Sequence, residues 1–412
     1  MQEELLADLV AALEARRHTP DFVFTVVDIS HYERWAYESR LVDLTDVIGH
    51  YSGLFAREAL DSQTVVDGTT GRRGLYMLPT GWVSHHVHVW ESLLERAGFT
   101  LSDIPKEWDA FWSFWCDQVQ PAVRKALGRD DMWGIGLPMS ATSVDTANGF
   151  WQFVSAYDAN YVTRDGRLVI DDPEVRRRLI KVIDSYTAIY RKGCTPPDSI
   201  SWDGYGNNAQ FLAQNIVMTV NQTLSVTSAL KGPRPEDYYH NAATVAWPTG
   251  AYGQPLVIET FVTRAAAFKA GEHVATAKEF VRFLVGEGWL AHYFDFSGER
   301  LLPPMTKLLD SPFWLDPSEL PIWRVSLLSA ASPFPFSHSQ DPKLTSRSLL
   351  TCSDQASGQV IVCRLPALAT FAGAVGATGV GEEHGNEDLL AHLIVGLGAA
   401  LGTGPLASAA GR

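Results

Sequence analysis

The hydrophobic pattern of the first three hundred residues alternates between short apolar runs and amphipathic stretches. Apolar, β-branched runs bounded by turn residues predict strands at residues 22–27, 75–78, 87–90, 133–137, 216–220 and 244–247. Apolar positions at helical spacing predict helices at residues 31–39, 91–97, 109–119, 142–157, 173–191, 207–214 and 275–285. Asp172 and Pro173 mark the start of the longest helix, and Pro79 is expected to end the second strand. Strands that alternate with helices predict an α/β fold with a largely parallel sheet.

The two ends of the chain differ from this middle part. Leu5, Leu9 and Leu13 recur at helical spacing among acidic residues, which predicts an amphipathic helix. The acidic opening does not resemble a secretion signal, and no apolar run is long enough to span a bilayer, so the chain taken literally is expected in the cytoplasm. Residues 320–412 form an atypical, low-charge C-terminal region that is expected to be a flexible tail or a frameshifted end.

Composition narrows the class of protein. A chain of 412 residues is long enough for two or three lobes. The net charge of -14 disfavours nucleic acid and anionic membrane surfaces as partners, because both attract basic faces. Four cysteines in this length exclude a disulfide-rich scaffold, and Cys116 and Cys194 are interpreted as isolated residues.

Several short segments resemble one known family in their order along the chain. They are residues 20–24 (PDFVF), 41–46 (LVDLTD), 74–79 (GLYMLP), 93–98 (LLERAG), 105–111 (PKEWDAF) and 277–284 (AKEFVRFL). Together they are similar to the extracellular solute-binding proteins of ABC importers, in the carbohydrate-binding group related to maltose-binding protein. The resemblance covers about residues 19–310.

The resemblance implies a two-lobe periplasmic-binding-protein-like α/β fold with a hinge and an interlobe cleft. It places residues 1–139 with 262–315 in the first lobe and residues 140–261 in the second, with crossovers near residues 138–140 and 260–264. The chain opens on what resembles the family's second helix, without the signal and first strand, and it has no match to the family's last helices after about residue 316. The resemblance further implies a periplasmic or extracellular monomer that binds a sugar or polyol, uses no cofactor and delivers its ligand to a membrane permease.

Sugar recognition combines aromatic faces, on which sugar rings stack, with planar polar groups that pair with hydroxyls. Trp82 follows the predicted strand before Pro79, and Trp202 lies in a glycine-rich polar loop that has no evident structural need for it. The full set of candidate ligand-binding residues is Trp35, Trp82, His85, Asp145, Asn148, Trp151, Trp202, Asn221, Trp247 and Glu259. Trp90, Trp112, Trp115 and Trp289 are interpreted as core residues.

Other classes of site fit less well. The cluster of His85, His86 and His88 suggests a zinc site. Only His86 and His88 would lie on one face of a strand, and no third ligand follows them at a known spacing, so no metal is expected. Dinucleotide-binding, P-loop and nucleophile-elbow motifs are missing from the sequence. The main hypothesis is a non-catalytic binding protein. The alternatives left open are a glycoside hydrolase, which would recruit two carboxyls from Asp145, Asp203 and Glu259, and a non-functional gene fragment.

Overall fold

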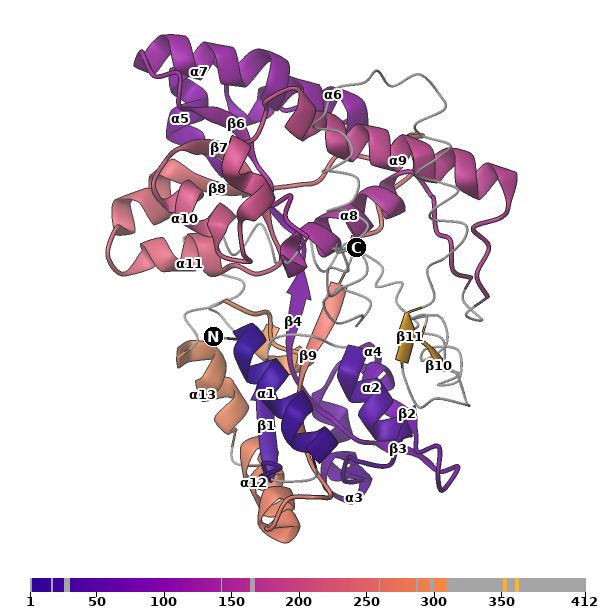
Figure 1. Cartoon of the computed structure of the whole chain (residues 1–412). Helices are drawn as coiled ribbons and strands as arrows, with labels where there is room; N and C mark the ends of the chain where they lie inside the picture. Colours follow the sequence, from indigo (N-terminus) through magenta and orange to yellow (C-terminus); the bar gives the residue numbers. More distant parts are fainter. Residues whose placement is uncertain are drawn as a thin grey trace, which may run out of the picture.

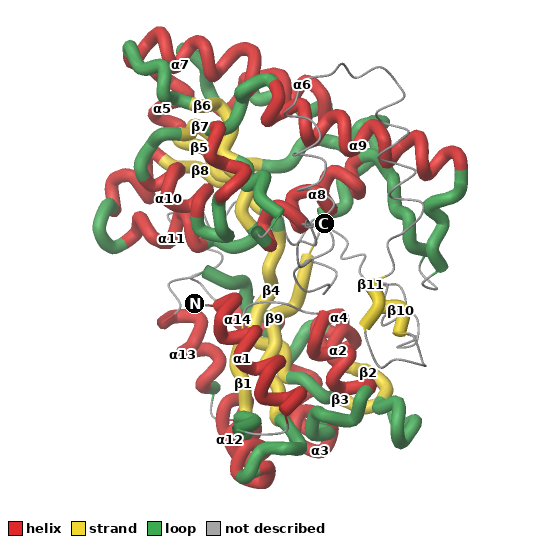
Figure 2. Tube along the Cα trace, in the orientation of Figure 1, coloured by secondary structure: helices red, strands yellow, loops and turns green. Residues whose placement is uncertain are grey.

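The computed structural model describes residues 2–15, 18–25, 30–141, 143–163, 167–258, 260–286, 288–296, 300–309, 351–353 and 360–362. These residues form two α/β lobes, one above the other in Figure 1, with the strands β4 (Leu78–Ser84) and β9 (Thr260–Ala267) running between them. The tube in Figure 2 shows the same arrangement, in which the long strands of the lower sheet point into the upper lobe. The two-lobe α/β fold implied by the resemblance is confirmed.

The lower lobe is built on a three-stranded antiparallel sheet. Its order is β1-β9-β4, with β1 at Phe22–Thr25. Successive residues of a strand point to opposite faces. On β9, Ala265 and Ala267 therefore pack with helices α12 (Val274–Gly286) and α13 (Trp289–Phe296), whereas Ala266 packs with α1 (Gln2–Ala15) and α2 (Ser30–Tyr37). The small alanines let helices approach the sheet closely on both faces.

The remaining elements of the lower lobe are short. They are α3 (Thr45–Ile48), α4 (Arg57–Gln63), α14 (Thr306–Leu309) and the antiparallel pair β2 (Thr64–Val66) and β3 (Arg73–Leu75). A further antiparallel pair, β10 (Thr351–Ser353) and β11 (Val360–Val362), lies within the C-terminal region, and the remainder of the predicted atypical region 320–412 lies outside the described residues.

The upper lobe is built on a four-stranded sheet in the order β6-β7-β5-β8. Its strands are β5 (His86–Trp90), β6 (Trp133–Gly136), β7 (Ile216–Asn221) and β8 (Ala242–Val245). Its helices are α5 (Glu91–Arg96), α6 (Trp108–Ser113), α7 (Gln120–Leu127), α8 (Val144–Ala156), α9 (Pro173–Arg191), α10 (Gly206–Leu212) and α11 (Ser225–Lys231). A turn of π-helix at Phe114–Val119 joins α6 to α7, and the Asp172 side chain caps α9 as predicted, accepting from the backbone N–H of Glu174 and Val175.

Three expectations about the strands were wrong. Among the described strands of the two sheets, every pairing is antiparallel except that of β6 with β7, so the prediction of a largely parallel sheet is wrong. Pro79 does not end a strand but lies inside β4, because β4 is an edge strand and its pairing shifts register between Pro79 and Gly81. The chain also passes into the second sheet at His85, between β4 and β5, so residues 86–139 pack in the upper lobe and the expected crossover near 138–140 is corrected.

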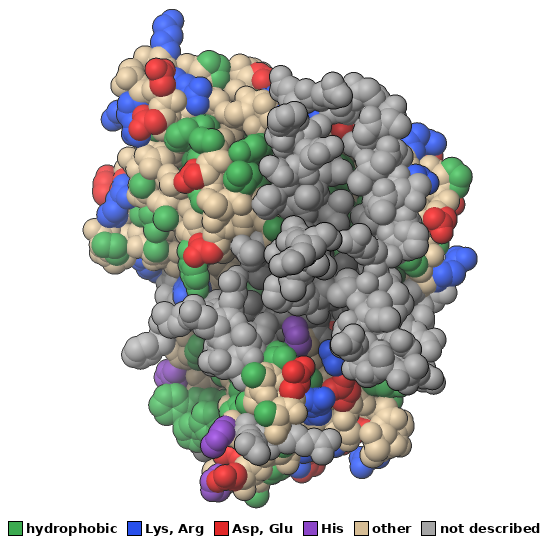
Figure 3. Space-filling view, viewed as in Figure 1, with side chains coloured by type: hydrophobic (Ala, Val, Ile, Leu, Met, Phe, Trp, Pro, Cys, Tyr) green, Lys and Arg blue, Asp and Glu red, His purple; other side chains and the backbone are tan. Residues whose placement is uncertain are grey.

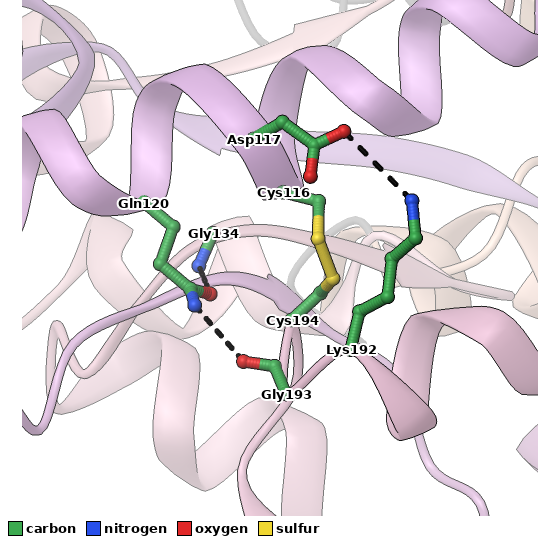
Figure 4. The surroundings of a disulfide bond; sticks show 7 residues. All are labelled: Cys116, Asp117, Gln120, Gly134, Lys192, Gly193 and Cys194. Atoms are coloured by element: carbon green, nitrogen blue, oxygen red, sulfur yellow. Dashed lines mark hydrogen bonds and ion pairs between the residues drawn. A yellow bond between two sulfur atoms is a disulfide. The ribbon is translucent and has the colours of Figure 1, made fainter.

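A disulfide joins two segments of the upper lobe that are 78 residues apart. Cys116, on the π-helix, is bonded to Cys194, which follows α9 (Figure 4). Beside the bond, the Gln120 side chain accepts from the backbone N–H of Gly134 and donates to the carbonyl of Gly193, both at 2.9 Å. The interpretation of these cysteines as isolated was therefore wrong, because the fold sets the segment after α9 beside β6, where the Ile135 N–H donates to the Cys194 carbonyl at 3.0 Å.

On the part of the upper lobe that Figure 3 shows in colour, acidic, basic and hydrophobic side chains are interspersed. No helix in the described part of the chain combines the length and the apolar character that a membrane crossing requires.

Candidate functional site

The candidate site lies at the carboxyl ends of β6 and β7. These two strands are parallel, so the segments that follow them leave the sheet at the same edge, where open α/β sheets bind ligands. Helix α8 begins shortly after β6, and Gln222 follows β7 directly. In the register of β5 with β7, Asn221 lies opposite His86, the first residue after the chain enters the upper lobe. This edge therefore faces the junction with the lower lobe.

Asp145, in the first turn of α8, is the central charged group at this edge. The Gln222 amide donates to its Oδ1 at 3.1 Å, whereas its buried Oδ2 has no hydrogen-bond partner among the described residues. Burial, and secondly the charge of Asp203, raise the pKa of Asp145 to about 7. Tyr186 packs beneath, and burial and the charge of Asp145 raise the pKa of its hydroxyl as well. Asp145 can therefore both donate and accept a hydrogen bond near neutral pH.

Other buried polar atoms on the segments at this edge have no hydrogen-bond partner in the described part of the chain. They come from the N-cap and first turn of α8, from the turn before Trp202 and from α10: Ser143 Oγ, Thr146 Oγ1, Ser199 Oγ, Asn207 Oδ1 and Asn208 Oδ1. The backbone N–H of Met139, after β6, donates to the Ser199 carbonyl at 2.9 Å, and the Asn207 amide donates to the Val220 carbonyl at 3.1 Å. The turn that contains Ser199 and the helix α10 are therefore both hydrogen-bonded to the carboxyl edge of the sheet. Buried polar groups are almost always paired, so this set is suited to a ligand rich in hydroxyl or amine groups.

Trp202 supplies an aromatic side chain beside these polar groups. It is buried, yet it belongs to none of the three hydrophobic clusters of the described residues. Its ring lies against Gly206, where an added Cβ would come 2.4 Å from the Trp202 Cγ. Glycine at this position is required for the ring to lie where it does. Asp203 orients the same loop, because its Oδ1 accepts from the backbone N–H of Tyr205 at 2.9 Å.

Several sequence candidates lie elsewhere. Trp35 packs in the lower lobe against Tyr32 and Phe268, and Trp82 lies within β4 with its side chain in a hydrophobic cluster. Trp247 stacks on Trp108 with ring centroids 6.1 Å apart. Packing accounts for these aromatic side chains.

The remaining candidates are distributed around the junction. The Trp247 indole donates to the His85 carbonyl at 2.9 Å, which fixes the segment where the chain changes lobes. Asn148 and Trp151 are half-buried on α8, and Trp151 stacks on Tyr161 with ring centroids 5.2 Å apart. The Asn221 amide donates to Ser225 Oγ at 3.0 Å, and Glu259 lies outside the described residues.

Gln222 and the small polar residues at this edge were not among the predicted site residues. One signal could have found them: Gln222 lies two residues after a predicted strand, and Ser143 and Thr146 follow another at the start of the next helix. Their chemistry is common in ordinary loops, so only the parallel pairing of β6 and β7 distinguishes them.

The histidines of β5 form a buried group rather than an open one. Burial lowers the pKa of His86 well below its usual range and that of His88 to about 4, so both are neutral at pH 7. His88 Nδ1 lies 3.0 Å from Thr244 Oγ1 on β8. Within the described ranges, no group of three histidine, cysteine or acidic side chains is placed to hold a metal.

Comparison with known structures finds proteins that share this fold. The maltose-bound MalE3 of T. maritima shares 16% identity and aligns with a TM-score of 0.66, covering 95% of this chain and 88% of that one. A sugar transporter of Arthrobacter chlorophenolicus A6 with bound laminaribiose shares 13% identity with a TM-score of 0.66, covering 98% and 89%. A solute-binding protein of Agrobacterium radiobacter K84 in complex with ribitol shares 15% identity with a TM-score of 0.66, covering 96% and 88%.

No curated protein sequence matches this chain. The family model for the bacterial extracellular solute-binding proteins matches residues 2–322, more than three quarters of the chain. The chain therefore belongs to the bacterial extracellular solute-binding protein family.

Proposed function

We propose that this protein is the sugar- or polyol-binding component of an ABC importer and that its ligand binds at the carboxyl edge of β6 and β7, between the lobes. The observation that carries the proposal is the set of buried polar atoms without partners beside Trp202, which matches what a hydroxylated ring requires. Structures that share this fold contain maltose, laminaribiose and ribitol.

The connection between the lobes supports a binding protein that closes on its ligand. β4 and β9 pair with each other and link the two sheets, so a small change in their backbone angles would rotate one lobe against the other. The closed, ligand-bound form would then be recognised by a membrane permease. No step of this cycle requires catalysis by the chain itself.

A glycoside hydrolase is the second candidate. The observation that favours it is the raised pKa of Asp145 beside the Asp203 carboxylate, because a hydrolase needs one protonated and one ionised carboxyl. Hydrolysis of aryl glycosides that is lost in Asp145→Asn would support the hydrolase, whereas saturable ligand binding without turnover supports the binding protein.

The disulfide supports a location outside the cytoplasm. Disulfides persist in the periplasm and outside the cell and are rare in the cytosol. The bond between Cys116 and Cys194 joins elements of the upper lobe core and would form in an oxidising compartment. This agrees with the extracellular character of the family.

A glycine pair tests the site at Trp202. An alanine at Gly206 would collide with the Trp202 ring, whereas an added Cβ at Gly204 meets no atom within 4 Å. Binding of maltose, laminaribiose, D-tagatose, D-mannitol and ribitol to wild type, Gly206→Ala and Gly204→Ala is measured by calorimetry, with thermal melts to verify folding. We expect at least one ligand to bind wild type and Gly204→Ala alike and to bind Gly206→Ala at least tenfold more weakly. Equal affinity in both variants would contradict the site, and no binding of any of them to wild type would contradict the function.

A further inference from the structure

Two carboxyl groups of this chain, those of Asp67 and Asp145, differ in the hydrogen bonds and charges that surround them. Asp67, in the lower lobe, is buried and fully paired: its carboxylate accepts from Ser39 Oγ at 2.6 Å, from Lys269 Nζ at 3.1 Å and from the backbone N–H of Thr69 and Thr70 at 2.9 Å. These donors hold the pKa of Asp67 far below its ordinary value, against the opposing effect of burial. Where a carboxylate is structural, this protein supplies both a cation and hydrogen-bond donors.

Asp145 has no such compensation within the described residues. One amide, from Gln222, binds Oδ1, and Oδ2 is buried without a donor. The other charge that acts on it is that of Asp203, which repels it, and no described lysine or arginine contributes to its electrostatics. An ionised carboxylate that has one amide donor, one enclosed oxygen and no cation destabilises the folded state, and a cationic donor on a bound ligand would remove this cost.

The chemistry of that partner follows from the charges. Asp203 is close enough for its charge to act on Asp145, so the two carboxylates together attract a positive charge, and the unpartnered Oδ2 of ionised Asp145 can accept a hydrogen bond. A metal ion would need further ligands, and in the described part of the chain no group of three suitable side chains lies together. An ammonium group on a hydroxylated molecule would satisfy both requirements, because it carries the charge and donates up to three hydrogen bonds.

We propose that this protein selects sugars or polyols that carry an ammonium group, and that the ammonium binds Oδ2 of Asp145 next to Asp203. This inference rests on the proposed function and specifies its ligand class. The hydroxyls of the same ligand pair with the polar atoms on α8 and α10, and Trp202 covers an apolar face. Anionic sugars are excluded from this edge by repulsion from both carboxylates.

The test compares each amine with its neutral parent. The pairs are 1-amino-1-deoxy-D-mannitol with D-mannitol, 1-amino-1-deoxyribitol with ribitol, and D-glucosamine with D-glucose, measured by calorimetry on the full chain. Aliphatic ammonium groups have a pKa near that of lysine, about 10.4, so the two amino-alditols stay cationic at pH 8. A hydrogen bond to a charged group corresponds to roughly ten- to a hundredfold in affinity. We expect at least one amine to bind that much more tightly than its parent.

A matched pair of variants assigns the preference to Asp145. In Asp145→Asn the amide oxygen still accepts from Gln222, but the charge is gone, and we expect the ratio of amine to parent affinity to fall to about one. Asp130 lies before the amino end of β6, at the opposite edge of the sheet, and its side chain is exposed. Asp130→Asn removes the same charge and should keep the full ratio.

A measurement on the wild-type protein keeps the proposal testable if Asp145→Asn does not fold. At pH 6, binding of an amino-alditol should release a proton from the carboxyl, seen as a dependence of the binding heat on the ionisation enthalpy of the buffer. Equal or weaker binding of every amine relative to its parent, or no proton release, would overturn the proposal. If neutral sugars bind and amines show no preference, the sugar-binding function still stands; if no ligand of either kind binds, both proposals fail.

Discussion

Replacing Asp145 by asparagine should make the free protein more stable at neutral and alkaline pH. In the folded chain, burial and the charge of Asp203 raise the pKa of this carboxyl to about 7, whereas in the unfolded chain the pKa is about 3.9. A carboxyl whose pKa is raised by folding keeps its proton in the folded state between these two values. Its contribution to stability is therefore lost as the pH rises through that window.

The magnitude follows from the size of this window. About three pKa units at about 1.36 kcal/mol per unit give about 4 kcal/mol at pH 8, where the folded carboxylate is ionised. The side chain is only half-buried, so solvent screening reduces the expected gain to about 2 to 4 kcal/mol. At pH 5, only about one unit above the pKa of the unfolded chain, the gain in the free energy of unfolding should be smaller than at pH 8 by about 2 kcal/mol.

The assay is urea unfolding of wild type, Asp145→Asn and Asp130→Asn at pH 5, 6, 7 and 8 without ligand. We expect the difference between Asp145→Asn and wild type to grow with pH, while Asp130→Asn follows wild type throughout. Parallel curves for Asp145→Asn and wild type, or a variant that is less stable at pH 8, would refute the assignment of a strained, ligand-directed carboxyl.

Three further predictions concern the scaffold. Reduction of the Cys116–Cys194 bond, which closes a loop of 78 residues, should lower the free energy of unfolding by about 2 to 4 kcal/mol. Melts with and without a reductant measure this loss, and a Cys116→Ser, Cys194→Ser double variant should no longer show it. His88 is neutral in the fold because burial lowers its pKa to about 4, so the free energy of unfolding of wild type should fall by about 3 kcal/mol as the pH falls from 6.5 to 4. An equal loss of stability in a His88→Gln variant would contradict this. Trp82→Ala should lower the free energy of unfolding by about 3 to 5 kcal/mol because the side chain packs in a hydrophobic cluster. An unchanged melting temperature with weakened ligand binding would instead indicate that Trp82 contacts the ligand.

The sequence alone determined the local elements and the family. The period of apolar residues located β1, β5, β6 and β7, and the Asp172–Pro173 pair located the start of α9, because side-chain direction and capping depend on neighbours along the chain. The ordered motifs over residues 19–310 indicated the two-lobe fold that the family model then matched. Asp145, Trp202 and Asn221 were predicted from sequence because they follow predicted strands or stand in a polar loop, and their role in binding stays a prediction.

Only the tertiary structure decided which of these residues lie close together and which are enclosed in the core. Trp35 and Trp82 had the composition of ligand contacts, but neighbouring elements enclose them in hydrophobic clusters. Cys116 and Cys194 lie far apart in sequence and meet because the segment after α9 lies beside β6. Asp145 has an ordinary sequence context. Its character arises because β6 and β7 are parallel, which brings Gln222 to one of its oxygens and Asp203 close to it, while burial leaves the other oxygen without a donor. Desolvation and long-range pairing depend on the whole fold, and no local pattern encodes them.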